Sequence, residues 1–174
     1  MEDQQKPTKK IALNYGLLLG FVSILQSLIL YAMGKTYDND WYTTAIGILI
    51  MAIIIFLGIK KYKESNNGFL SLGQGLKTGV GIALIAAVVS IIYTVIFVKF
   101  IEPDFINHIV EVQRQKMLEN PNMTDEMIDK IGQGTRDYFY VFTIGMIFIF
   151  NIFIGFVVSL VTSLILKKSE EDQY

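Results

Sequence analysis

Long apolar runs separated by polar segments make up most of this chain. Four runs carry no charged side chain deep in their interior, and they cover residues 11–33, 41–59, 76–101 and 138–166. An α-helix of about 20 apolar residues crosses the ~30 Å hydrocarbon layer of a bilayer. The pattern therefore predicts an all-α integral membrane protein with four transmembrane helices. Because 174 residues leave only short tails and one sizeable loop, we expect a single membrane domain over residues 1–174.

The composition is also typical of a membrane protein. Hydrophobic residues make up 52% and charged residues 18%, and the mean hydropathy is +0.46, whereas roughly a quarter of an ordinary soluble domain is charged. The net charge of -1 offers no basic surface for nucleic acid. The absence of cysteine excludes disulfides, thiol catalysis and cysteine-bound metals. The lipid bilayer is the expected partner, and nucleic acid is not.

The first apolar run follows Lys6, Lys9 and Lys10, as the core of a secretory signal peptide would. The run at 11–33 is longer than the roughly 7 to 15 residues of a signal core, and residues 30–34 form a poor small-residue cleavage site. We therefore expect a retained first helix.

Basic residues predict the orientation of the four helices. With the N-terminus inside, nine lysines fall on the inner side, close to the ends of the spans: Lys6, Lys9, Lys10, Lys60, Lys61, Lys63, Lys77, Lys167 and Lys168. The outer side then holds six basic residues over a longer stretch: Lys35, Lys99, Arg114, Lys116, Lys130 and Arg136. Because cytoplasmic flanks carry an excess of Lys and Arg, both termini are expected inside.

The polar segment at 102–137 is expected to form a helical extracytoplasmic loop. Pro103 suits the first position of an amphipathic helix that ends at Asn120-Pro121, and its apolar residues gather on one side: Phe105, Ile106, Ile109, Val110, Val112 and Met117. A second helix follows, capped by Thr124 and ended by Gly132 and Gly134. We expect the two helices to pack as a hairpin over the outer ends of the spans.

The start of the third helix carries a local signal of its own. Ser71-Leu72-Gly73-Gln74 has the Ser-x-x-Gln form of a capping box, in which each side chain satisfies a free backbone N–H at a helix start. The third helix should therefore begin near Leu72, before the apolar run itself.

Stripes of small residues predict how the helices pack. In the first run the stripe consists of Gly16, Gly20, Ser23 and Ser27, and in the third it consists of Gly75, Gly79, Ala83, Ala86 and Ser90. Small residues at such spacings let a second helix backbone approach closely. The two stripes match at an offset of 63 positions, which fits either a duplicated two-helix unit or chance alignment of residues common in membrane helices.

Two amides, Gln26 and Asn151, lie within the apolar runs together with several hydroxyl groups. Such groups either line a polar pathway or form hydrogen bonds between helices, and the second use is the more common. Ion-coupled transporters usually place ionisable side chains at depth, and this chain has none there.

The single histidine, His108, shares a helical face with Asp104 and Glu111 at spacings i, i+4 and i+7. That pattern could bind a divalent metal weakly or respond to pH, but it is also the ordinary solvated side of an amphipathic helix. We favour the second reading and assign no metal, no cofactor and no catalytic residue. No nucleophile–base set, phosphate-binding loop or metalloprotease motif occurs in the sequence, so an enzyme is not expected.

Three segments in this order resemble a known family. They are Lys-Lys-Ile-Ala-Leu-Asn-Tyr-Gly-Leu at residues 9–17, Gly-Phe-Leu-Ser-Leu-Gly-Gln-Gly-Leu-Lys-Thr-Gly at 68–79, and an acidic helical insert before a Phe-rich fourth run. The chain resembles, from about Lys9 to Lys168, the bacterial membrane family known as domain of unknown function 4199 (DUF4199). The resemblance implies a four-helix protein of the bacterial cytoplasmic (inner) membrane and brings no functional residues.

Two functions remain at this point. The favoured one is a non-enzymatic interaction or accessory subunit, which associates with a membrane-protein partner or with copies of itself. The alternative is a small oligomeric transporter or channel lined by Gln26, Asn151 and the hydroxyl groups. A buried polar channel at the two amides would favour transport, and a dry, well-packed bundle would favour the accessory role.

Overall fold

The computed structural model describes the backbone of residues 2–38 and 40–168 and the side chains of residues 8–38 and 40–168. The described chain is all-helical, and its elements are α1 (Glu2–Ala32), α2 (Trp41–Ser65), α3 (Leu72–Ile96), a π-helical turn η1 (Phe97–Ile101), α4 (Phe105–Leu118) and α5 (Asp125–Leu166). The described residues contain no β-strand beyond one isolated bridge between Leu70 and Lys168.

Four helical segments are long and apolar enough to cross a membrane, as the sequence predicts: Thr8–Ala32, Trp41–Ser65, Leu72–Ile101 and Asp125–Leu166. These helices extend past the apolar runs, because α2 continues through the lysines at 60–63 and α5 begins far upstream of its run. The length and composition of these helices fit a multi-pass membrane protein.

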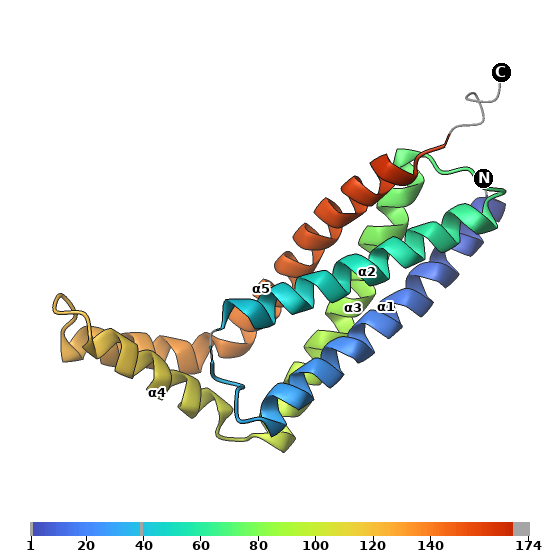
Figure 1. The fold of residues 1–174 in the computed structure, drawn as a ribbon. Coiled ribbons are helices and arrows are strands. Elements are labelled where there is room, and N and C mark those ends of the chain that lie inside the picture. Colours follow the sequence, from blue (N-terminus) through green and yellow to red (C-terminus); the bar gives the residue numbers. More distant parts are fainter. Residues whose placement is uncertain (1, 39, 169–174) are drawn as a thin grey trace.

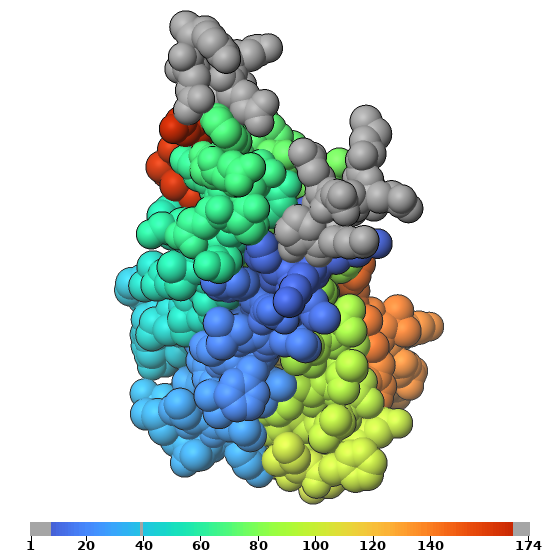
Figure 2. All heavy atoms as spheres, turned by 90° about the vertical axis from the view of Figure 1, so that its right-hand side faces the viewer, coloured from blue at the N-terminus to red at the C-terminus, as the bar shows by residue number. Residues whose placement is uncertain are grey.

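The four apolar helices form a bundle with α3 at its centre (Figure 1). Helix α3 packs extensively on α1 and on α5, while α2 contacts all three. In Figure 2, α1 occupies the middle of the face shown, between α2 and the half of α3 that leads to η1. Ile55 and Ile59 of α2 and Ile82 and Ala83 of α3 have no exposed surface, so the middle of the bundle is filled with aliphatic side chains.

One end of the bundle, called the basic end here, carries Lys60, Lys61, Lys63, Lys167 and Lys168. The segment before α3 is fixed there to the end of α5, since the backbones at 70 and 168 exchange hydrogen bonds of 3.0 and 3.1 Å. The Nζ of Lys63 donates to the carbonyl of residue 166 at 2.8 Å, which satisfies a carbonyl that the end of a helix leaves free. The start of α1 lies at the same end (Figure 1).

Local hydrogen bonds fix both helix boundaries at this end. The capping box is confirmed, because the Ser71 hydroxyl accepts from the backbone N–H of Gln74 and the Gln74 side chain accepts from that of Ser71. Helix α2 ends at Ser65, and Asn67 beyond it has φ 55°. The N–H of Gly68 donates to the Lys63 carbonyl at 2.9 Å, an arrangement that satisfies a carbonyl of the last turn.

The small-residue stripe of α1 faces α3. A Cβ added at Gly16 would lie 2.6 Å from the Ile85 Cβ, and one added at Gly20 would lie 2.6 Å from a Val89 methyl. Farther along, the Tyr93 hydroxyl donates to the Ser27 hydroxyl at 3.2 Å. The glycines therefore allow the two backbones to approach closely, and the larger side chains of α3 fill the space that they leave.

The stripe of α3 faces α5, and the two helices meet through small residues on both sides. Gly75 packs against Ser163, Gly79 against Ser159, and Ala83 against Gly155. A Cβ at Gly79 would lie 2.7 Å from the Ser159 Cβ, and one at Gly75 would lie 2.8 Å from the Ser163 Cβ. The stripes of α1 and α3 thus face different neighbours, and their duplication stays a hypothesis.

Residues between the third and fourth apolar runs form an arm, defined here as α4 and residues 125–137 of α5. Two predictions for it are wrong. Pro103 lies in the turn before α4, whose N-cap is Asp104, and Gly132 does not end a helix but lies inside the continuous α5. A mid-helix glycine costs about 1 kcal/mol, but Gly132 allows α4 to pack closely, since a Cβ there would lie 3.2 Å from a Val110 methyl. Gly134 is also helical.

The arm is a hairpin, as expected, but it lies beside the bundle and not over its ends. Helix α5 bends between its arm part and the longer part that belongs to the bundle. The arm therefore projects sideways from the bundle, at the end that lies opposite the basic end (Figure 1). The Thr124 cap is confirmed, because its hydroxyl accepts from the Met127 N–H at 3.3 Å. Buried Val110 and Ile128 show that the apolar side of α4 rests on α5.

Candidate functional site

The arm meets the bundle through a cluster of aromatic rings. Phe105, at the start of α4, makes edge-to-face contacts with Phe97 of η1 at 5.6 Å and with Phe139 of α5 at 5.9 Å between ring centroids. Its ring also lies 5.5 Å from that of Tyr37 in the α1–α2 turn. Edge-to-face pairs stabilise by about 0.5–1.5 kcal/mol beyond the area they bury. Phe105 thus links the arm to three separate parts of the bundle.

A polar cluster of Tyr31, Tyr37, Glu102 and His108 borders these rings. The Tyr31 hydroxyl donates to Glu102 Oε2 at 2.7 Å. The Nδ1 of His108 lies 2.9 Å from the Tyr37 hydroxyl and 3.4 Å from Glu102 Oε1. The cluster joins α1, the α1–α2 turn and both sides of the connection from α3 to α4, so it fixes the direction in which the arm leaves the bundle.

Tyr37 keeps its proton in this cluster. Burial raises the pKa of its hydroxyl above the ordinary value, and the Glu102 carboxylate raises that pKa further, because both disfavour a phenolate. The hydroxyl is therefore a donor at neutral pH, and it can donate to Nδ1 of His108 whenever that nitrogen carries no proton.

The carboxylate that pairs with His108 belongs to Glu102, and not to Asp104 or Glu111, which share its helical face. The nearest carboxylate is that of Glu102, whose side chain is 20% exposed, while Asp104 and Glu111 are exposed. Among the described residues, no group of three His, Asp or Glu side chains is placed to hold a metal ion. The sequence missed Glu102 as a partner because it lies outside the helix, where spacing carries no signal.

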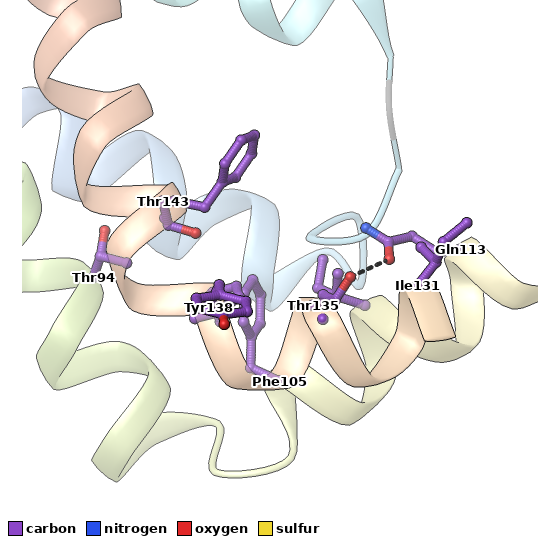
Figure 3. A pocket seen from close by; sticks show the side chains of 11 residues that line it. Thr94, Phe105, Gln113, Ile131, Thr135, Tyr138 and Thr143 are labelled. Carbon is purple, nitrogen blue, oxygen red and sulfur yellow. Dashed lines mark hydrogen bonds between the residues drawn. The ribbon is translucent and has the colours of Figure 1, made fainter. Parts of the chain in front are cut away.

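A cavity of about 750 Å³ opens between the arm and the bundle, next to the aromatic cluster. Its walls come from Thr94 near the end of α3, from the α4 face that includes Phe105, and from α5 between Ile131 and Thr143 (Figure 3). Three other cavities on the described surface hold about 410 Å³ or less. The turn of α5 between its two halves creates this cavity, and no sequence pattern predicts it.

The cavity wall is apolar with a few polar groups. The Thr135 hydroxyl donates to Gln113 Oε1 at 3.0 Å, a bond that leaves the amide nitrogen of Gln113 outside it (Figure 3). The Thr94 hydroxyl is bonded to a carbonyl of its own helix, at Ser90. Tyr138 and Thr143 add two hydroxyls. A large apolar pocket with a few polar groups is the usual form of a small-molecule site.

The two amides of the apolar helices lie apart from this cavity, and each bonds to a helix backbone. Gln26 donates to the Thr43 carbonyl at 3.1 Å and so joins α1 to α2. Asn151 donates to the Ile147 carbonyl of its own helix at 2.8 Å. Neither residue lines the cavities described above.

Other hydroxyls of the runs serve packing. Ser23 and Ser159 bond to carbonyls of their own helices, at Leu19 and Gly155. Ser163 is fully buried, and its hydroxyl has no hydrogen-bond partner among the described residues. The last two residues of the α3 small-residue stripe differ in burial: Ala86 is buried in the core, and Ser90 is half-buried.

The comparison with protein families matches the chain over most of its length. The family described as protein of unknown function (DUF4199) matches residues 14–168. The chain belongs to the DUF4199 family. Membership in DUF4199 confirms the resemblance seen in the sequence, and the match covers the bundle and the arm alike. No curated protein and no solved structure matches the chain.

The DUF4199 description assigns no activity and no functional residue, so the site rests on geometry alone. The arm brings together the aromatic cluster, the polar cluster and the cavity at one end of the bundle. The sequence pattern predicts the amphipathic helix of the arm but not the cavity.

Proposed function

We propose that this protein is a non-enzymatic interaction or accessory subunit of the bacterial cytoplasmic membrane, with both termini inside and the arm outside. The spans anchor the chain in the bilayer, and the arm presents a surface to a membrane-protein partner or to a second copy. The proposal includes no catalytic activity, cofactor or metal.

The observation that carries the proposal is the contrast between the bundle and the arm. The bundle core holds aliphatic side chains packed against small residues, and both intramembrane amides are bonded to helix carbonyls. The arm instead exposes much of the α4 polar face. This arrangement favours a recognition surface over a polar pathway through the bundle, and it argues against the transporter alternative.

Charge supports the orientation in the proposal. The basic end carries the lysines at 60, 61, 63, 167 and 168, and positive charge close to span ends marks the cytoplasmic side. The arm leaves the bundle at the opposite end (Figure 1). Its basic residues are partly neutralised, since Arg114 pairs with Asp129 at 2.8 Å and Lys130 with Glu126 at 3.5 Å.

Site-specific photocrosslinking in intact cells tests the accessory role. A benzophenone amino acid at Glu111 or Lys116, both exposed on α4, should form a crosslink to a discrete polypeptide. The same amino acid at Leu49, which is exposed on α2 within an expected span, is the matched control and should crosslink only to lipid. Polypeptide crosslinks from Leu49 and none from the arm would contradict the proposal and favour an oligomer that associates through its spans.

A further inference from the structure

We propose that the cavity between the arm and the bundle is a binding site for one acyl chain of a membrane phospholipid in the outer leaflet. The inference rests on the proposed function, since it places the arm at the outer surface of the bilayer. It goes further by assigning a ligand class to the cavity.

The chemistry of the wall selects the ligand. None of the residues that line the cavity is charged, and a charged group placed against such a wall would lose its hydration without gaining an ionic partner. Phe105, Ile109, Ile131, Phe139 and Phe142 supply most of the apolar surface. A volume of about 750 Å³ lies within the ~300–1,000 Å³ range of small-ligand sites, so the wall suits a neutral hydrocarbon chain.

The position of the cavity gives a lipid direct access. Tyr138 and Phe142 line it and are 67% and 69% exposed, and aromatic rings of this kind concentrate where a bilayer meets water. Beyond them, the bundle half of α5 continues with exposed Ile149 and Phe153. The cavity is thus continuous with a surface that the proposed orientation turns toward lipid.

Two polar groups can donate hydrogen bonds to the ester oxygen atoms at the end of an acyl chain. The Gln113 amide nitrogen has no hydrogen-bond partner among the described residues, because its Thr135 bond uses the oxygen. The Tyr138 hydroxyl also has no partner in the described part of the chain and lines the cavity. An ester carbonyl accepts from such donors. A peptide segment would need partners for many backbone groups, which this wall does not supply, so the acyl chain is the better fit.

A variant that fills the cavity tests the proposal. A Cβ added at Gly134 has no neighbour within 4 Å, and Gly134 lines the cavity, so Gly134→Phe can place its ring there without a backbone clash. Gly145→Phe is the matched control, because Gly145 lies in the same helix with equally open surroundings and is not part of the wall. Gly134→Leu, which fills less of the cavity, should have an intermediate effect.

The protein is reconstituted in phosphatidylethanolamine–phosphatidylglycerol vesicles that contain a trace of phosphatidylethanolamine with a diazirine on one acyl chain. Photolabel on Ile109 and Thr143 should fall roughly tenfold in Gly134→Phe and stay at the wild-type level in Gly145→Phe. Equal labelling of these two residues in both variants would overturn the proposal, as would a polypeptide found in the cavity in place of lipid. Label on Phe153 but none at the cavity would overturn this inference alone, whereas no label on Phe153 would contradict the membrane placement itself.

Discussion

Gly79→Leu should destabilise the bundle more than any other single substitution considered for this protein. A side chain at this position would collide with Ser159 of α5 and would place its Cβ 3.1 Å from an Ile55 methyl of α2. Because backbone on α3 and side chains on both neighbours would have to move, we expect a loss of about 3 kcal/mol or more in the free energy of unfolding. Unfolding in mixed detergent micelles, followed by circular dichroism, measures this loss.

Gly145→Leu is the control for this substitution. It adds the same atoms to a helical glycine of the same bundle, but a Cβ there meets nothing within 4 Å. Its free energy of unfolding should stay at the wild-type level or rise by up to about 1 kcal/mol, because a mid-helix glycine costs about that much. Equal losses at Gly79 and Gly145 would mean that the α3–α5 contact is not the close one described here.

Phe105→Ala should release the arm while leaving the bundle folded. The substitution removes the ring that contacts Phe97, Phe139 and Tyr37, and truncating a packed aromatic side chain costs about 3–5 kcal/mol in a full core and less at a half-buried site. Spin labels at Lys116 on the arm and Leu49 on the bundle should show a broad distance distribution in the variant and a narrow one in the wild type.

Phe100→Ala is the control for this substitution. It also removes an aromatic ring, but not one that joins the arm to the bundle. Phe100 belongs to the same connection but is 77% exposed, so its removal should leave the distance distribution narrow. A narrow distribution in Phe105→Ala would show that the polar cluster around Glu102 holds the arm without help from the aromatic rings.

The sequence predicts the helical elements because the features that form them, namely apolar length and capping side chains, lie close together along the chain. Apolar length predicts the four long helices, and the Ser71–Gln74 pair and Thr124 place helix starts through hydrogen bonds that span only three residues. The small residues of α1 and α3 were also visible, but not which helices they face. The partner stripe Gly155, Ser159 and Ser163 on α5 became evident only in the structure.

Local sequence patterns do not predict the full structure of the arm. Gly132 and Gly134 are unfavourable in a helix by propensity, yet α5 runs through both. Gly132 packs on Val110, and a cost of about 1 kcal/mol per glycine is too small to end the helix. The partnership of Glu102 with His108 and Tyr31, and the cavity beside it, depend on the turn of α5 and on contacts between residues far apart in sequence. No local pattern encodes these contacts.

Accessibility of single cysteines in intact cells tests the central claim, a membrane-spanning bundle with the basic end inside and the arm outside. The chain has no native cysteine, so Asn122→Cys at the tip of the arm and Glu64→Cys at the basic end each provide the only thiol. Both residues are exposed. An impermeant maleimide should label the Asn122 variant in intact cells and the Glu64 variant only after the membrane is opened. Labelling of the Glu64 variant alone in intact cells would reverse the orientation. Labelling of both variants in intact cells, or of neither, would contradict a membrane-spanning bundle with these two sites on opposite sides.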